Sequence, residues 1–343
     1  MTEPLLSIRD LRTYFHMTDG VARSVDGVSF DVAQGETLGI VGESGCGKSV
    51  TALSILRLIQ PPGRIEPGSR IIFEGKDLAS ISDDEIRKVR GNRISMIFQE
   101  PMSALNPVFS VGDQVAEVAR IHEGIGKRAA FDRAVEALAL TGIPAPRERA
   151  REYPHQLSGG MRQRVLIAMA LMMKPALVIA DEPTTALDVT IQAQILDLLR
   201  DLQQRFNTSI LMITHDLGVI AETTSRVIVM YAGEVVEEAS VERLFANPHH
   251  PYTEGLMHAM PQLGRERERL NVIPGMVPPA TDWPGGCRFR ERCPYSWELC
   301  EREHPPLYQI GENHSSRCHI AIEPERRNHP HAPLVVQEGV AAA

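Results

Sequence analysis

The fold of this chain is decided by residues 37–58, TLGIVGESGCGKSVTALSILRL. The segment starts with an apolar run of strand type, TLGIV, and turns through a stretch rich in glycine. It continues as SVTALSILRL, in which apolar residues recur at helical spacing until Pro61, Pro62 and Gly63 end the pattern. A strand, a glycine-rich turn and a helix in this order form the context that a phosphate-binding loop requires.

Residues 42–49, GESGCGKS, match the pattern G-x-x-x-x-G-K-S within this segment. The glycines let backbone N–H groups turn inward, so that these amides and the helix N-terminus can meet a β-phosphate. Lys48 supplies a positive charge, and the hydroxyl of Ser49 can ligate the Mg²⁺ that bridges the β- and γ-phosphates. An ordinary glycine-rich turn is the alternative, and the flanking elements favour nucleotide binding. The predicted ATP contacts from this loop are Gly42, Ser44, Gly45, Cys46, Gly47, Lys48, Ser49 and Val50, with no redox role for Cys46.

A pair of carboxylates ends the apolar run LVIADEP, residues 177–183. The carboxyl edge of a doubly wound sheet is where such folds bind ligands. Asp181 is predicted to face the metal, and Glu182 to accept a proton from an attacking water. A helix cap or a solvated turn is the alternative, because Asp-Glu-Pro is also good loop chemistry.

Two further polar residues follow apolar runs in the same way. Gln99 comes after SMIF and is predicted to touch both Mg²⁺ and the attacking water, and His215 comes after SILMIT. Either residue could instead be an exposed loop residue. The repeated position at a strand end favours a shared site.

The predicted fold class is α/β. Residues 5–40 alternate β-branched runs with turns and predict a meander of strands, and Asp113 to about Leu140 has helical spacing. LVIAD and SILMIT suit a parallel sheet buried on both faces, with a helix-like segment between them. Beyond about Ser240 the composition shifts to Pro, His and Arg, which indicates a separate appendage.

The composition is that of a soluble globular protein, with 343 residues, 43% hydrophobic and 23% charged. A net charge of -8 argues against a nucleic-acid partner. The N-terminus lacks the pattern of a secretory signal, and the most apolar stretch, Val165 to Ala180, is broken by Lys174 and Pro175. We therefore expect a cytoplasmic chain without a membrane span of its own.

The motif LSGGMRQR, residues 157–164, reveals a family resemblance. Together with GESGCGKS, the glutamine of IFQEP, LVIADEP, the ALD of TTALD and the histidine of ITHD, it resembles the motif set of ABC-type ATPases over residues 5–240. The resemblance implies a P-loop NTPase fold, the ABC nucleotide-binding domain. Such a domain has a RecA-like core, an antiparallel β subdomain and a helical subdomain, here at about residues 101–160.

The same resemblance implies a dimer in which two ATP-binding subunits face each other head to tail. ATP then lies between the phosphate loop of one subunit and Ser158, Gly159 and Gly160 of the other, at a helix N-terminus. Met161 stands where many relatives have Gln. The remaining implied roles are Glu182 as general base, His215 as γ-phosphate switch, Gln99 as the link to the membrane partner, Asp188 at the subunit interface, and Phe15, or else Tyr14, against adenine.

Longer segments look like the peptide-import ATPases of the dipeptide and oligopeptide class: MIFQEPMSALNP, YPHQLSGGM, DEPTTALDVTIQAQI, MYAGEVVE and NPHHPYTEGL. The HPY at 250–252 begins the C-terminal extension of that class, which nickel and some sugar importers share. The implied partners are a second, similar ATPase, two membrane permeases and an extracytoplasmic binding protein. The chain would then act peripherally on the cytoplasmic face of the inner membrane. A soluble ABC ATPase acting on nucleic acid is the alternative from another class, and the acidic balance disfavours it.

Four cysteines gather in the predicted extension, residues 241–325, ahead of a predicted loose tail at 326–343. Their spacing lacks the C-x-x-C pairs of common zinc sites, and a reducing cytoplasm disfavours disulfides. A shared metal centre is expected because so small a unit needs a staple, and thiolates suit zinc or an iron–sulfur cluster. The resemblance favours a four-iron four-sulfur cluster. Its ligands would be Cys287, Cys293, Cys300 and Cys318.

Overall fold

The computed structural model describes residues 3–99, 104–185, 187–260 and 271–337. These residues form two compact units. The helical unit comprises the described parts of Met1–Leu6, Asp31–Thr37 and Ile72–Ile213. The C-terminal unit comprises the described parts of Ser7–Phe30, Leu38–Ile71 and Thr214–Ala343.

A buried parallel sheet forms the centre of the helical unit. Strand β8 (Leu177–Asp181) pairs in parallel with β7 (Ile94–Ile97) and with β9 (Ser209–Thr214). Every residue of β8 and β9 is buried, as expected for parallel strands covered on both faces. Helix α8 (Val189–Phe206) connects these two strands and ends at Asn207, which has a left-handed conformation with φ 50°. The predicted strand–helix–strand order is confirmed.

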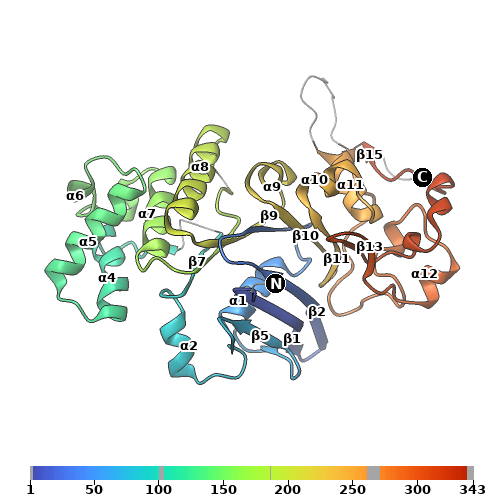
Figure 1. The fold of residues 1–343 in the computed structure, drawn as a ribbon, viewed down its shortest axis with the longest axis horizontal. Helices are drawn as coiled ribbons and strands as arrows, with labels where there is room; N and C mark the ends of the chain where they lie inside the picture. Colours follow the sequence, from blue (N-terminus) through green and yellow to red (C-terminus); the bar gives the residue numbers. More distant parts are fainter. Residues whose placement is uncertain (1–2, 100–103, 186, 261–270, 338–343) are drawn as a thin grey trace. The chain divides into compact units, whose positions relative to one another are not determined.

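Helices make up the middle of the helical unit, as the spacing of apolar residues predicts. Helices α4 to α7 lie together in Figure 1, and the buried faces of α4, α5 and α7 share one apolar cluster. Alanines on α5 allow this close approach, since Ala130, Ala134 and Ala137 are all buried. The elements are α4 (Val111–Glu123), α5 (Lys127–Leu140), α6 (Pro146–Arg149), the 3-10 turn η1 (Pro154–Gln156) and α7 (Gly159–Leu171).

A short helix with a side-chain cap precedes helices α4 to α7 in the chain. Helix α2 (Asp83–Val89) begins with a capping box, in which Ser82 accepts from the backbone of Glu85 and the Glu85 side chain accepts from the backbone of Ser82. Strands β5 (Arg70–Phe73) and β6 (Lys76–Asp77) form a hairpin just before it.

The C-terminal unit contains five neighbouring strands of an eight-stranded sheet, in the order β13-β14-β11-β10-β3. Strand β3 (Thr37–Val41) is parallel to β10 (Arg226–Tyr231), and β10 is antiparallel to β11 (Glu234–Ser240). The next strands, β14 (His314–Ser316) and β13 (Tyr308–Gly311), continue the sheet from the exposed edge of β11. Two strands from the residues beyond Ser240 therefore extend this sheet.

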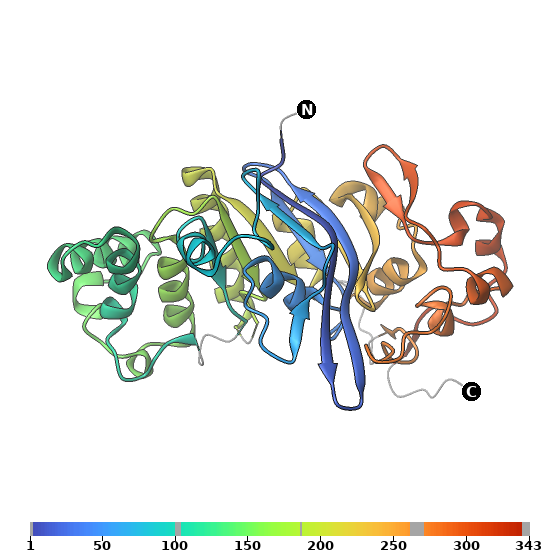
Figure 2. The ribbon, with the colours of Figure 1, turned by 90° about the horizontal axis from the view of Figure 1, so that it is seen from below.

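Long strands at the beginning of the chain belong to the same unit. Figure 2 shows β1 (Leu6–Met17) and β2 (Gly20–Val32) as two long neighbouring strands near the N-terminus. The short strand β4 (Gly63–Ile65) pairs antiparallel with β1, and helix α1 (Lys48–Ile55) follows β3.

Short elements complete the C-terminal unit. Near the end of the described residues, β15 pairs with β12 through Asn271 and Gln337. In the part of the chain described above, no helix combines the length and the apolar character needed to cross a membrane. The elements are α9 (Leu217–Thr223), α10 (Val241–Ala246), α11 (Pro251–Ala259), β12 (Asn271–Val272), η2 (Arg290–Arg292), α12 (Glu298–Arg302), η3 (His319–Ala321), η4 (Pro324–Asn328) and β15 (Val336–Gln337).

A buried carboxylate joins the extension to β11. Glu237 accepts hydrogen bonds from the backbone N–H groups of His249 (2.7 Å) and His250 (2.8 Å) and contacts Nε2 of His314 at 2.8 Å. His250 is buried at the N-terminus of α11, where its Nδ1 accepts from the N–H of Tyr252 at 3.1 Å. Burial lowers the pKa of His250 to about 4.

We predict that His250 makes the stability of this protein dependent on pH. The pKa of His250 is lower in the folded state than the ordinary value of 6.5, so the unfolded state binds the proton first as the pH falls. The contribution of His250 to the free energy of unfolding is fully present above pH 6.5 and is lost as the pH falls toward 4. At pH 5 the loss is about 2 kcal/mol. His250→Asn keeps a capping acceptor and should reduce the difference between urea unfolding free energies at pH 7 and pH 5 by that amount. His258→Asn, on an exposed face of the same helix, is the control, and an unchanged difference in His250→Asn would contradict the assignment.

Candidate nucleotide site

The predicted phosphate loop lies between β3 and α1 in the C-terminal unit. Its backbone is packed against neighbouring strands so closely that side chains are excluded at two positions. A Cβ atom on Gly42 would lie 2.3 Å from the carbonyl oxygen of Met230, and one on Gly47 would lie 2.4 Å from that of Ser24. Gly47 also has φ 102°, a conformation that favours glycine. The glycines are therefore required by packing as well as by the turn.

Lys48 lies across this loop. Its Nζ donates to the carbonyl oxygens of Gly42 at 2.7 Å and Glu43 at 3.0 Å, and the residue is only 6% exposed. Within the described residues its partners are these two neutral oxygens and the thiol of Cys46, which leaves the ammonium available to an anionic ligand. The Cys46 thiol is buried beside it, and burial raises its pKa in spite of the nearby lysine. A neutral, buried thiol agrees with the prediction that Cys46 has no redox role.

The rest of the loop is more open. Ser44 and Gly45 are exposed, and Ser49 and Val50 are half-buried in the first turn of α1. The helix has no side-chain cap at its N-terminus. Its first N–H groups are consequently directed toward the loop, as an anion site requires.

Tyr14 and Phe15 are the two candidates for contact with adenine. The Tyr14 hydroxyl donates to Asp26 at 2.6 Å, and burial, aided by Asp26, raises the pKa of Tyr14 to about 12. Phe15 stands opposite Gly63 in the β1–β4 register, and its Cε1 would be 2.6 Å from a Cβ on that glycine. Neighbouring strand residues point to opposite faces, so only one of the two rings can serve. The hydrogen bond that holds Tyr14 to Asp26 favours Phe15 as the ring that contacts adenine.

The predicted carboxylates lie in the helical unit, at the end of β8. Asp181 is the last strand residue and is 4% exposed. Glu182 has φ 48°, uncommon for a residue with a side chain, and its N–H donates to the carbonyl oxygen of Ile213 at 2.8 Å. The backbone bond to Ile213 holds this turn in place.

Gln99 and Glu182 are brought together by the fold. Gln99 Nε2 donates to Glu182 Oε2 at 2.9 Å, and the hydroxyl of Thr185 donates to the same oxygen at 2.9 Å. Two neutral donors therefore orient this carboxylate. The sequence does not single out Thr185, although it lies within the quoted motif DEPTTALD.

The predicted signature residues also lie in the helical unit. Ser158 caps the 13-residue helix α7, with its Oγ accepting from the N–H of Met161 at 3.3 Å, and Gly159 is exposed. Gly160 packs against α8, because a Cβ there would lie 2.9 Å from Cγ2 of Ile191. Asp188 in turn caps α8 by accepting from the N–H of Ile191 at 2.9 Å. The N-termini of the two helices thus lie close together.

His215 follows β9 and is exposed, and the neighbouring Asp216 caps α9. His215 belongs to the C-terminal unit with the phosphate loop, whereas the carboxylates and the signature belong to the helical unit.

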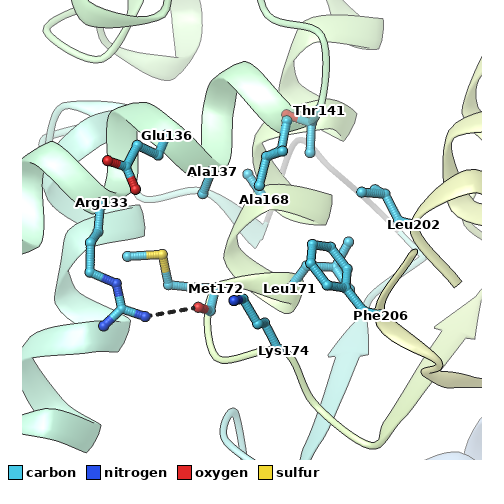
Figure 3. Close-up of a pocket in the computed structure, with 11 residues that line it drawn as sticks. Arg133, Glu136, Ala137, Thr141, Ala168, Leu171, Met172, Lys174, Leu202 and Phe206 are labelled. Atoms are coloured by element: carbon cyan, nitrogen blue, oxygen red, sulfur yellow. Dashed lines mark hydrogen bonds between the residues drawn. The ribbon is translucent and has the colours of Figure 1, made fainter. Parts of the chain in front are cut away.

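A cavity of about 130 Å³ in the helical unit lies apart from all of these residues. Figure 3 shows its walls, in which Arg133 donates to the carbonyl oxygen of Met172 at 3.4 Å. Its lining comes from α5, α7, α8 and the turn after α7, and includes none of the predicted nucleotide contacts.

The four clustered cysteines influence one another but do not form a ligand set. The N–H of Cys287 donates to the carbonyl oxygen of Cys300 at 2.8 Å. Burial raises the pKa of all four thiols, that of Cys287 to about 12, and the other three thiols add to the rise at Cys293. Across the described residues, no three His, Cys, Asp or Glu side chains are arranged to hold a metal ion. The predicted cluster at Cys287, Cys293, Cys300 and Cys318 therefore has no support from this geometry.

Comparison with known proteins settles the family. Residues 25–185 match the model described as ABC transporter, and residues 236–300 match that of the oligopeptide/dipeptide transporter C-terminal region. The chain is 52% identical to the oligopeptide transport ATP-binding protein AppD of Bacillus subtilis, over 93% of this chain and 97% of that protein. The chain belongs to the ABC transporter family.

Further similarities agree with this membership. This ABC protein is 47% identical to the dipeptide transport ATP-binding protein DppD of Escherichia coli, over 93% of this chain and 97% of that one. It also resembles the ATP-binding cassette MJ0796, solved as a dimer with ADP and phosphate, with a TM-score of 0.62, 27% identity and coverage of 69% of this chain and 98% of that one. The predicted ABC ATPase fold is confirmed.

Proposed function

We propose that this ABC ATPase couples ATP hydrolysis to the import of dipeptides or oligopeptides. The observation that carries the proposal is similarity along nearly the whole chain, C-terminal extension included, to proteins named for peptide transport. Nickel or sugar import is the alternative within the same class, because related importers share the extension. Net charge -8 disfavours an ATPase acting on nucleic acid.

The phosphate loop would bind the β- and γ-phosphates of ATP through its backbone amides and Lys48. Mg²⁺ would be held by Ser49, Asp181 and Gln99, and would neutralise charge that develops on the phosphates. Phe15 would stack on adenine, and His215 would contact the γ-phosphate. These assignments rest on the buried lysine, the uncapped N-terminus of α1 and the position of Gln99, Asp181 and His215 at or just after strand ends.

Glu182 would act as the general base for the attacking water. Gln99 and Thr185 hold one of its oxygens in place, which orients the carboxylate before the reaction. Gln99 would also link the site to the membrane partner, as the family resemblance implies.

A second ATPase subunit would complete each site. Ser158 and Gly159 are exposed at the N-terminus of α7, where amides and helix dipole can meet a γ-phosphate bound by the partner. We infer a heterodimer with a similar but distinct ATPase, with Asp188 near the interface.

The helical unit offers a docking surface for the permeases. A groove of about 530 Å³ runs along α4 and the segment before it, and Phe109 and Val108 beside it are 54% and 70% exposed. Exposed large apolar side chains next to a groove are typical of a protein interface. We infer that a cytoplasmic segment of each permease binds here, which would hold the ATPase at the inner face of the membrane, with an extracytoplasmic binding protein delivering the peptide. The groove is lined by Ala104, Asn106, Phe109, Asp113, Gln114, Ala116, Glu117, Arg120, Lys127 and Met169.

The cysteine cluster remains our prediction from the sequence. It rests on the four cysteines that gather between residues 287 and 318 and on the family resemblance. A four-iron four-sulfur centre, with zinc as the alternative, would cross-link the extension.

Glu182→Gln should retain ATP binding and lower turnover about 10²- to 10⁴-fold, because the proton acceptor is lost while the Gln99 contact persists. Lys48→Ala should weaken ATP binding itself. ATPase rates of the assembled transporter and uptake of radiolabelled di- and oligopeptides measure both effects. Near-normal turnover in Glu182→Gln would remove the assigned base, and normal peptide uptake would point to another solute.

Phe109→Asp should weaken recovery of the permeases with the ATPase while leaving ATP binding intact, because a charge replaces an exposed apolar contact. Met276→Asp is the matched control, since Met276 is 86% exposed in the C-terminal unit. Equal recovery in the two variants would rule out this groove as the docking surface.

Cys300→Ser should abolish visible absorbance and bound iron if the cluster forms. Metal analysis of anaerobically purified protein measures both, with Cys46→Ser as control. Absence of iron and zinc from the parent protein would rule out the metal centre.

A further inference from the structure

The extension holds the second residue of the phosphate loop through a bidentate ion pair. Arg292 Nη1 contacts Glu43 Oε2 at 2.6 Å, and Nη2 contacts Oε1 at 3.1 Å. The side chain of Arg292 is 4% exposed. Arginine forms such forked pairs because its guanidinium is planar, and lysine cannot reproduce them.

The backbone of the same residue is also bound. The N–H of Glu43 donates to the hydroxyl of Tyr252 at 2.7 Å, and its carbonyl oxygen accepts from Lys48 at 3.0 Å. Tyr252 is buried in α11, directly after the HP of the HPY motif. The extension therefore holds Glu43 at two points, its side chain through Arg292 and its N–H through Tyr252, while its carbonyl oxygen is bound within the loop.

Arg292 is itself immobilised. Its Nε donates to the carbonyl oxygen of Pro274 at 2.8 Å, and its guanidinium lies 5.7 Å from the ring centre of Tyr231 and 5.9 Å from that of Phe289. Tyr231, Tyr252 and Phe289 pack together, with ring centres 4.7 to 5.5 Å apart. A locked side chain can transmit position to the loop, whereas a mobile surface arginine cannot.

We propose that Arg292 and Tyr252 are positioning residues for the phosphate loop, through which the C-terminal extension sets the affinity for ATP. The inference rests on the proposed nucleotide role of residues 42–49. Neither side chain needs to touch ATP, because both act through Glu43. Cys293 follows Arg292 directly in the chain, so a change that loosens the extension there would also affect the phosphate loop.

The test titrates a fluorescent ATP analogue with Mg²⁺ into the full-length protein and measures KM and kcat in the assembled transporter. Arg292→Lys, Glu43→Gln and Tyr252→Phe should each weaken affinity and raise KM about tenfold, with kcat at saturating ATP changed less than twofold. Tyr252→Phe keeps the ring and removes only the hydroxyl. The affinity of the double variant Arg292→Lys with Glu43→Gln for the ATP analogue should be no lower than that of either single variant.

Arg290→Lys is the matched control, because Arg290 lies in the same 3-10 turn and pairs with Glu291. Unchanged affinity in Arg292→Lys and Tyr252→Phe, or strictly additive losses in the double variant, would overturn the proposal. The variant Lys48→Ala distinguishes a failure of this inference from a failure of the proposed nucleotide site. If it weakens binding while the Arg292 and Tyr252 variants do not, only this inference fails, and if it too has no effect, the proposed nucleotide site fails.

Discussion

The close packing of the phosphate-loop backbone is the constraint on which the nucleotide site depends. Gly42 and Gly47 lie so near the carbonyl oxygens of Met230 and Ser24 that no side chain fits. The loop is thereby held by strands on either side of it and presents its remaining surface to a ligand. Lys48 can then remain buried with neutral partners, so the loop carries an uncompensated positive charge where phosphates would bind.

The backbone at Glu182 is constrained in a similar way. The left-handed conformation of Glu182 is unusual for a residue with a side chain, and the backbone bond to Ile213 maintains it. Gln99 and Thr185 then orient the carboxylate with neutral hydrogen bonds. A carboxylate held by hydrogen bonds in this way suits the general-base role that we propose for Glu182.

The C-terminal extension is part of the sheet architecture. Strand β14 covers the edge of β11, and Glu237 gathers the backbone of His249 and His250 at the start of α11. An exposed strand edge is a liability that proteins cover, and here the cover also carries the residues that reach Glu43. The extension and the phosphate loop thus share one unit.

Local patterns in the sequence determined the strand–loop–helix around Lys48, the buried parallel strands and the residues at their ends. These features depend on spacing over a few residues, which local sterics and hydrogen bonding control. The hydrogen bond from Tyr14 to Asp26, which favours Phe15 as the proposed adenine contact, depends on tertiary structure. The strands at 308–316 were likewise not predicted, because that segment was assessed only by its composition. Pairing of Arg292 with Glu43, 249 positions apart, was decided by tertiary structure alone, because no local rule relates residues so distant until folding buries them together.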